Sequence, residues 1–215
     1  MQDVLNALEK TRAASRTLAT MTPDTSAAVL RALADNIDAE TRQILAANAQ
    51  DLAAMPKDDP RYDRLLLDEK RLKAIADDVR KVAALPAPAG VTLEQKTLPN
   101  GLSLEKRSVP LGVVGVIYES RPNVTVDVFA LCFRAGNAVA LKGGKEADHS
   151  NRAFVDVIHK TLDAAGLSRD SAYLLPPLRE ATTTLLNAVG LVDICIPRGS
   201  QALIDHVRQN ARIPV

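Results

Sequence analysis

The sequence predicts an α/β protein whose main part is a doubly wound, parallel, Rossmann-like sheet, preceded by an N-terminal helical segment and a protruding β-hairpin. From residue 110 onward, short apolar runs alternate four times with stretches of helical periodicity. An alternation of this kind implies right-handed crossovers and a parallel sheet. Residues 1–90 show helical spacing of apolar residues, and an Asn-Gly turn separates two polar stretches within residues 91–109. We therefore expect three parts: helices at 1–90, a hairpin at 91–109 and the Rossmann-like part at 110–215.

The first part carries clear helix starts and stops. Thr22, Pro23 and Asp24 are typical of a helix start, because Thr caps, Pro fits the first helical position and an acid suits the first turn. Asp68 is a second candidate cap, and prolines near residue 86 end the segment. Between these signals the apolar residues recur at helical steps: Leu30, Leu33, Ile37, Ile44, Leu72, Ile75 and Val79.

The second part reads as a polar two-stranded hairpin. Asn100-Gly101 is a strong turn signal, and the segments on both sides of it alternate apolar and polar residues. An isolated hairpin is rarely stable alone. We therefore expect the segment 91–109 to contact another part of a larger assembly.

The third part contains four predicted strands, at 112–118, 138–141, 172–175 and 192–196, with helices at 124–134, 147–165, 180–188 and 201–209. Residues 213–215 look like the start of a fifth strand, so the chain is expected to be truncated. Ligands of such sheets bind beyond the carboxyl ends of the strands. Three segments rich in glycine, charge or hydroxyl groups lie there, at 118–123, 142–146 and 197–200, and we predict that they form one site.

Two of these segments suit a phosphorylated ligand, but each has a simpler interpretation. In 142–146, two glycines allow close backbone approach and two lysines supply positive charge for a ribose or a 2′-phosphate. The same composition is typical of a solvated turn. In 197–200, the free N–H groups of the following helix suit a phosphate. Ser200 can equally serve as a plain helix cap.

The segment 118–123 packs five polar groups into six residues. Asn123 offers a side-chain amide for a developing oxyanion, and Arg121 suits a carboxylate or phosphate. The alternative is a polar loop that caps the next helix.

Composition excludes several classes of function. Lys plus Arg is 27 and Asp plus Glu is 26, so the net charge of +1 gives no field for nucleic acid or an anionic membrane. Neither a GxGxxG nor a P-loop motif is present, and the three histidines lack metal-ligand spacing. Cys132 and Cys195 lie in apolar elements, which predicts core packing rather than reactivity. Without a signal peptide or a membrane-length apolar run, we expect a cytoplasmic protein.

The motifs resemble one family closely. The similarity includes Asn48–Leu52, Asp63–Leu65, Leu98–Leu102, Lys106–Thr125 with its Tyr-Glu-Ser-Arg-Pro-Asn stretch, Ala135–Ala138, Lys142–Ala147 and Ile196–Gly199. The chain resembles the N-terminal part of the γ-glutamyl phosphate reductases (glutamate-5-semialdehyde dehydrogenases), a branch of the aldehyde dehydrogenase superfamily. The resemblance spans essentially all of its residues.

The resemblance implies NADPH-dependent reduction of γ-glutamyl 5-phosphate to glutamate 5-semialdehyde, in proline biosynthesis. In this family a cysteine displaces phosphate to form a thioester, which hydride then reduces. It also implies a homo-oligomer with contacts through the hairpin, and allows association with glutamate 5-kinase. No metal, nucleic acid or membrane is implied.

The resemblance also assigns residues. Asn123 would help to hold the oxyanion, and Lys142 with Gly143 would contact the adenosine ribose. Lys145 stands where NAD-preferring relatives often carry an acid, so a cation there favours the 2′-phosphate of NADP(H). The remaining assignments are Gly199 and Ser200 near the pyrophosphate, and Glu119, Ser120 and Arg121 on the substrate side.

Two departures from the family pattern affect these expectations. The nucleophilic cysteine of the family belongs to a second domain, and neither Cys132 nor Cys195 matches its motif, so this chain alone should not turn over substrate. The loop 175–180 differs from the usual Val-Pro-Thr-Thr-Asp-Arg. Two other hypotheses remain open: a non-catalytic nucleotide-binding or assembly domain, and a related acylating aldehyde dehydrogenase with another acyl donor.

Overall fold

The structure is a computed structural model that describes residues 1–215. Its helices are α1 (Gln2–Leu18), α2 (Pro23–Ala39), α3 (Thr41–Ala53), α4 (Tyr62–Leu65), α5 (Glu69–Ala84), α6 (Asn123–Arg134), α7 (Asp148–Ala164), α8 (Arg179–Leu186) and α9 (Gln201–Asn210), with 3₁₀ turns η1 (Lys145–Ala147) and η2 (Arg169–Ser171). Its strands are β1 (Thr92–Thr97), β2 (Ser103–Arg107), β3 (Val113–Tyr118), β4 (Ala138–Lys142), β5 (Ala172–Leu174) and β6 (Ile194–Arg198). No helix has both the length and the apolar character needed to cross a membrane.

Four strands form the predicted parallel sheet, in the order β5-β4-β3-β6. All residues of β3 and β4 are buried, as their apolar sequence predicts, and Lys142 at the end of β4 is the one charged residue among them. The chain adds β4 and β5 on one side of β3 and then returns to place β6 on the other. This reversal between β3 and β6 is the topological switch point of a doubly wound sheet, where ligands bind.

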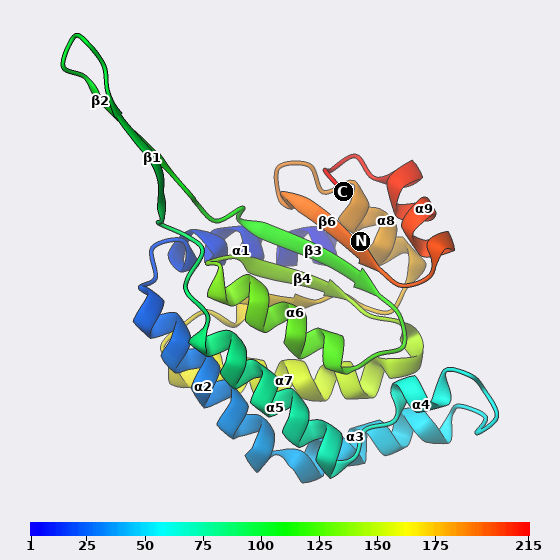
Figure 1. Cartoon of the computed structure of the whole chain (residues 1–215). Helices are drawn as coiled ribbons and strands as arrows, with labels where there is room; N and C mark the ends of the chain where they lie inside the picture. The colour runs from blue at the N-terminus through cyan, green and yellow to red at the C-terminus, as the bar shows by residue number, and fades with distance from the viewer.

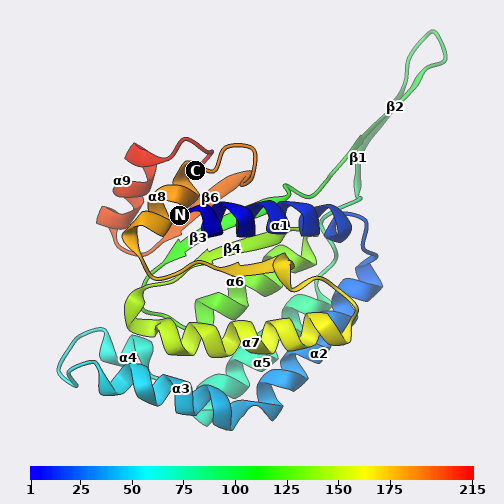
Figure 2. The ribbon, with the colours of Figure 1, turned by 180° about the vertical axis from the view of Figure 1, so that it is seen from behind.

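Helices cover both faces of the sheet, and a further helical layer lies outside one of them. In Figures 1 and 2, α1 crosses one face beside α8, while α6 and α7 cover the opposite face. Helices α2, α3 and α5 pack on the outer side of α6 and α7. The fold class predicted from the sequence is therefore confirmed.

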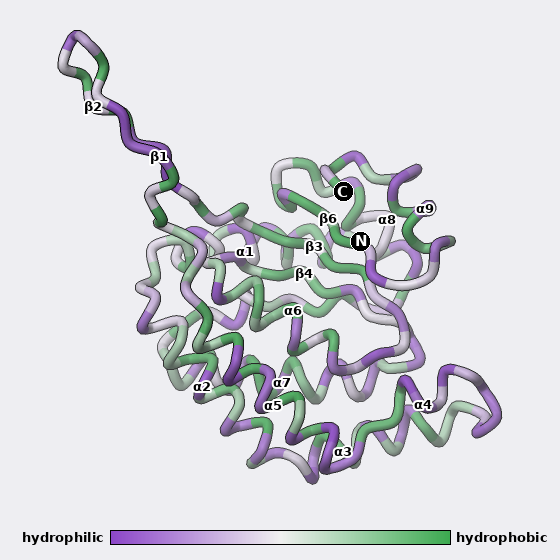
Figure 3. The backbone as a smooth tube through the Cα atoms, in the orientation of Figure 1, coloured by the Kyte–Doolittle hydropathy of each residue, from purple (hydrophilic) through white to green (hydrophobic).

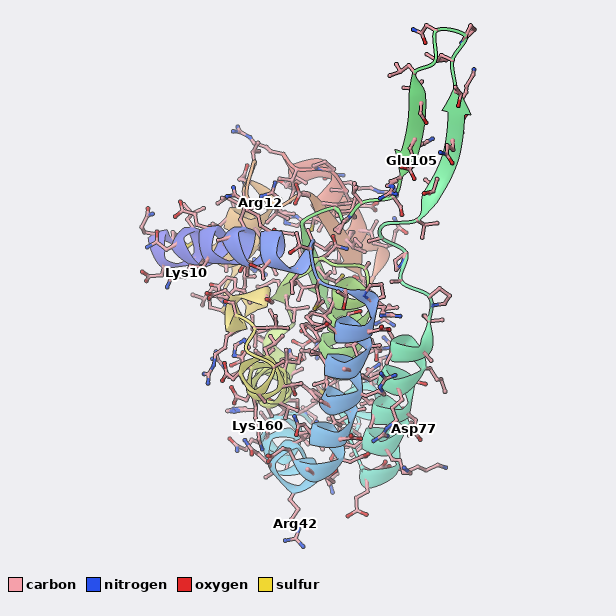
Figure 4. The ribbon with its side chains drawn as sticks, turned by 90° about the vertical axis from the view of Figure 1, so that its left-hand side faces the viewer. Lys10, Arg12, Arg42, Asp77, Glu105 and Lys160 are labelled. Atoms are coloured by element: carbon pink, nitrogen blue, oxygen red, sulfur yellow. The ribbon has the colours of Figure 1, made fainter.

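The N-terminal helices and the sheet share one hydrophobic core. A single cluster of 45 buried residues extends from Val4 in α1 to Ile213 near the C-terminus. The Arg12 guanidinium of α1 pairs with Asp193, which also accepts a hydrogen bond from the Val113 N–H at 2.7 Å. Figure 4 shows Arg12 on α1, which runs beside the sheet. This contact connects α1 to the beginning of both β3 and β6.

The β1–β2 hairpin extends away from the body of the molecule (Figure 1), and all residues of both strands are exposed. Its strands pair antiparallel from Thr92↔Arg107 to Thr97↔Ser103, and Gly101 adopts a φ of +83° in the turn. Figure 3 shows the contrast in hydropathy: β1 is largely purple, whereas β3 and β4 are green. The protruding hairpin predicted from the Asn-Gly turn is present, with strands at Thr92–Thr97 and Ser103–Arg107.

The predicted helix caps are present, but the predicted fifth strand is not. The Thr22 and Asp68 side chains accept hydrogen bonds from Thr25 N–H at 3.2 Å and Arg71 N–H at 2.6 Å. The prediction of a strand start at 213–215 is wrong, because these residues form no strand. The Cys195 N–H donates to the Pro214 carbonyl at 2.8 Å, so the end of the chain lies against the free edge of β6. Pro214 has no N–H group with which to extend this contact into a ladder.

Candidate functional site

The three polar turns predicted to form one site meet at the carboxyl ends of the strands. The Glu119 carboxylate, after β3, accepts hydrogen bonds from the N–H and the hydroxyl of Ser200, both at 2.9 Å. The Ser120 N–H donates to Glu146 at 3.2 Å, and the Ser120 hydroxyl donates to the same carboxylate oxygen. These contacts link the turns after β3, β4 and β6 directly.

The Glu119–Ser200 contact occupies the start of α9. Ser200 caps this helix by accepting from the Leu203 N–H at 3.4 Å, as its position predicted. Its own N–H, which the sequence indicated for a phosphate, donates to the Glu119 carboxylate. The helix N-terminus therefore favours an anion, and in this structure an internal carboxylate holds that place.

Ser120 holds an unusual backbone conformation at the rim. It is the one residue other than glycine with a positive φ, at 21°, and it is buried. Such a conformation costs on the order of 1–3 kcal/mol and persists only where its surroundings hold it. Burial favours the neutral form of Glu146, but hydrogen bonds from Ser120 and from the Glu146 N–H, together with the charge of Arg61, outweigh that effect, and the net pKa of Glu146 is lowered. Glu146 therefore stays ionised and holds the strained turn.

Two clefts open at this rim, on either side of the Glu119–Ser200 contact. The first, which we call the α8/α9 cleft, has a volume of about 610 Å³. Its lining combines apolar, hydroxyl and cationic side chains and includes Tyr118, Lys142, Arg179, Thr183, Leu203 and His206. Lys142 is buried, and its ammonium donates to the Gly143 carbonyl at 2.9 Å. Burial lowers the pKa of Lys142.

Gly143 lines the α8/α9 cleft, and close packing against its Cα explains why this position is a glycine. A Cβ added to Gly143 would lie 2.3 Å from the Asn151 side-chain nitrogen and 3.2 Å from the Tyr118 ring. Asn151 accepts from Thr125 at 2.9 Å, and the Thr125 and Tyr118 hydroxyls lie 2.7 Å apart. Any larger side chain at Gly143 would disturb this buried network beneath the rim.

The second cleft, which we call the arginine cleft, has a volume of about 460 Å³. Its ten lining residues include one hydrophobic side chain; they are Arg61, Arg64, Glu119, Ser120, Arg121, Val124, Glu146, Arg198, Gly199 and Ser200. Arg61 pairs with Asp59 at 2.6 Å. The other three arginines form no ion pair, as the arginine pairs of the molecule involve other residues.

The structure places most of the predicted residues at the rim, but not all of them in these clefts. Asn123 begins α6 and donates its side-chain amide to Asp127 at 2.8 Å, and it lines neither cleft. Lys145 is exposed and faces a separate hollow beside Asp51 and Asp148. Their roles as oxyanion donor and 2′-phosphate contact stay predictions.

Four cations of the two clefts were missed by the sequence reasoning: Arg61, Arg64, Arg179 and Arg198. Arg198 lies inside the predicted site segment 197–200, at the end of a strand, and this position could have predicted its place in the site. Arg179 begins α8 directly after a loop that follows β5, which is also a strand-end position. Nothing local in the sequence indicates that α4 reaches the rim.

Neither thiol lies in these clefts. Cys195 is fully buried in the core, and Cys132 packs partly buried against it, as the sequence predicted. Burial raises the pKa of each thiol to about 12. Both side chains are therefore protonated and unreactive at neutral pH.

The doubly wound sheet and its helical layers define the fold class of this chain. Its fold matches an acetylating aldehyde dehydrogenase from Geobacillus thermoglucosidasius with a TM-score of 0.76 at 17% identity, over 99% of this chain and 45% of that one. The fold is thus that of the aldehyde dehydrogenase-like proteins.

The particular relatives are γ-glutamyl phosphate reductases. The chain is 55% identical to the protein of that name from Chlorobium luteolum over 212 residues, which are 99% of this chain and 50% of that protein. It is 52% identical to the Legionella pneumophila protein over 99% of this chain and 51% of that protein. The crystal structure of the Thermotoga maritima γ-glutamyl phosphate reductase matches with a TM-score of 0.95 at 30% identity, over 99% of this chain and 52% of that one.

The resemblance recognised in the sequence motifs is therefore confirmed: the chain is homologous to γ-glutamyl phosphate reductases along nearly all its length. It spans about half the length of the curated relatives it matches. No protein-family model matches the sequence.

Proposed function

We propose that this chain supplies the cofactor-binding part of an NADPH-dependent reductase that converts γ-glutamyl 5-phosphate to glutamate 5-semialdehyde in proline biosynthesis. Relatives at 52–55% identity carry the name γ-glutamyl phosphate reductase. The observation that carries the proposal is the α8/α9 cleft, which places Lys142, Gly143 and Ser200 around one space at the switch point.

The residues of the α8/α9 cleft fit a dinucleotide. A volume of about 610 Å³ is within the range of ligand pockets. Lys142 and Arg179 supply positive charge, and the N–H groups at the start of α9 would bind the phosphates in place of the Glu119 carboxylate. Leu203 and Ala202 offer apolar surface for a base. When bound, the reduced nicotinamide supplies the hydride for an acyl group.

Within this proposal the chain binds and orients its ligands but does not provide the nucleophile. Both thiols are buried with raised pKa values, so neither suits attack on an acyl phosphate. The arginine cleft adjoins the α8/α9 cleft through Glu119 and Ser200, and would hold the phosphorylated substrate next to the cofactor. The division into a helical part (1–90), an assembly hairpin (91–109) and a Rossmann-like part (110–215) belongs to the same proposal.

The exposed hairpin supports a homo-oligomer. Its two strands bury none of their residues, and Leu93 and Leu104 are 59% and 46% exposed. Unpaired backbone edges of this kind are ready to pair with another chain. Association with glutamate 5-kinase stays a prediction.

Titration of the chain with NADPH and with NADH tests the proposed function. Because the chain contains no Trp, the emission of the reduced nicotinamide is the signal. We expect saturable binding with NADPH tighter than NADH, and weaker NADPH binding in Lys145→Glu than in the control Lys96→Glu on the exposed β1 strand. Tighter binding of NADH would contradict the cofactor assignment. Unchanged NADPH binding in Lys145→Glu would remove Lys145 from the site.

A further inference from the structure

The arginine cleft concentrates more positive charge than the rest of this nearly neutral chain. It holds four arginines and two glutamates, a net charge of two, whereas the whole chain has a net charge of +1. The guanidinium groups of Arg64, Arg121 and Arg198 form no ion pair within the chain. Like charges gathered in one cleft without partners repel one another. An anionic ligand would relieve this repulsion.

Arg61 and Arg64 of the arginine cleft are held at the rim by buried contacts of the α4 segment. Leu65, at the end of α4, is fully buried against Met55 and Ala147, and Ala147 belongs to the turn after β4. The buried Asn48 side chain donates to the Leu65 carbonyl at 2.8 Å and accepts from the Leu67 N–H at 2.9 Å. Figure 1 shows α4 and its preceding loop extending from α3 beyond the helical layer. The α4 segment, and with it Arg61 and Arg64, is therefore fixed beside the rim.

The size and lining of the arginine cleft limit the kind of anion. A volume of about 460 Å³ suits a small molecule. The lining contains no aromatic side chain and a single hydrophobic one, so it offers no stacking surface for a nucleobase. Arginine forks bind carboxylate and phosphate groups through paired hydrogen bonds. Several forks from different elements, α4, the turn after β3 and the end of β6, suit a molecule with more than one anionic group.

We propose that Arg64 and Arg198, together with Arg121 of the same cleft, are specificity-determining residues that select a small aliphatic molecule carrying two or more carboxylate or phosphate groups. Arg64 belongs to α4, Arg121 to the turn after β3, and Arg198 to the end of β6. The inference rests on the proposed function, since it assigns the substrate side of the same site. It adds a recognition role for α4, a segment distant in sequence from the Rossmann-like part.

Binding of simple anions to the 215-residue chain tests this inference. The probes are inorganic phosphate, glutarate and the neutral glutarate diamide, followed by NMR through backbone amide shifts at low ionic strength, where charge interactions are least screened. The variants are Arg64→Gln, Arg198→Gln and Arg64→Lys, with Arg42→Gln as matched control. Arg42 is exposed, lines neither cleft and points into solvent at the far end of the molecule in Figure 4.

We expect glutarate to bind saturably, with shifts at Arg64 and Arg198, and the diamide not to bind. Arg64→Gln and Arg198→Gln should each weaken glutarate binding by roughly tenfold, since each removes a charge-assisted hydrogen bond. Arg64→Lys should restore part of the loss, and Arg42→Gln should change nothing. Equal affinity in Arg64→Gln and Arg42→Gln, or no saturable binding of any anion to the unaltered chain, would overturn the inference.

The same variants separate this inference from the proposed function. Arg64→Gln should bind NADPH as the unaltered chain does, because Arg64 does not line the α8/α9 cleft. If the unaltered chain binds anions but does not bind NADPH, the result counts against the cofactor proposal alone. Normal thermal unfolding of each variant shows that an altered affinity does not come from misfolding.

Discussion

The two clefts at the rim share Glu119 and Ser200 but differ in nearly everything else. The α8/α9 cleft combines apolar side chains, hydroxyl groups and a buried lysine in about 610 Å³, whereas the arginine cleft has about 460 Å³ and four guanidinium groups. The first suits a long ligand with both a flat apolar part and phosphates. The second suits a short, highly charged one. The difference in lining predicts that the two clefts at one switch point select different ligands.

Neither cleft contains a thiol, and the low reactivity of Cys132 and Cys195 gives the largest expected effect. Because burial raises the pKa of Cys132 and Cys195 from 9.0 to about 12, the thiolate fraction at neutral pH falls by about a thousandfold. We expect a thiol reagent to label neither cysteine in the native chain and both after unfolding. Rapid native labelling of one cysteine, located by mass spectrometry, would contradict this.

The same thiols predict a pH dependence of stability. Their pKa values are raised in the folded state, so the folded chain retains protons that the unfolded chain releases above pH 9. The free energy of unfolding should therefore fall as pH rises from 9.0 toward 12, and this contribution should be complete below 9. Chemical denaturation at several alkaline pH values measures it, with Cys195→Ala as the variant expected to flatten the slope.

Gly143 tests whether the α8/α9 cleft depends on the network below it. In Gly143→Ala the added Cβ would lie 2.3 Å from the Asn151 side chain, which must move. Overpacking of this kind costs about 1–3 kcal/mol of stability. We expect a lower denaturation midpoint and weaker NADPH binding, with anion binding in the arginine cleft retained. Full stability in Gly143→Ala would show that the network is not rigid.

Arg179 provides a second test of the cofactor assignment in the α8/α9 cleft. Its side chain lines this cleft together with Lys142, whereas Lys145 faces a separate hollow. Arg179→Gln should weaken NADPH binding by roughly tenfold, the value of one charged hydrogen bond, and leave NADH binding almost unchanged. The control is Arg42→Gln. An equal loss for both cofactors would place Arg179 away from the 2′-phosphate.

Replacement of Glu119 has the smallest expected effect on NADPH binding, and it should strengthen the binding that the other variants weaken. Its carboxylate occupies the Ser200 N–H and hydroxyl that a phosphate would use. In Glu119→Gln the side chain loses its charge and competes less well, so NADPH should bind a few-fold more tightly. The exposed hairpin residue Glu94 provides the control variant Glu94→Gln. Weaker NADPH binding in Glu119→Gln would mean that the carboxylate supports the ligand instead of competing with it.

Most of the sheet and its rim could be predicted from the sequence. The run at residues 112–118 is apolar throughout because β3 is buried on both faces, and parallel topology alone brings the following turns together. Helix caps such as Thr22 and Asp68 are local signals, and the structure confirms both.

Other features depend on tertiary contacts that no local pattern encodes. The position of α4 beside the rim depends on Asn48 and on the burial of Leu65, and both residues are far in sequence from the turns after β3 and β6. The pairing of Glu119 with Ser200 joins positions 81 residues apart in sequence, both exposed and without any apolar pattern. The contact of Asn123 with Asp127 is different, because these residues lie four apart in α6 and their contact is local.

Under the two proposals, a phosphorylated dinucleotide binds in the α8/α9 cleft while small anions bind in the arginine cleft. The most direct measurement maps backbone amide shifts of the chain on addition of NADPH and, separately, of glutarate. The account predicts shifts at 142–144 and 199–203 with NADPH, and at 61–64 and 198 with glutarate. Shifts at the same residues for both ligands, or shifts confined to regions away from the rim, would contradict it.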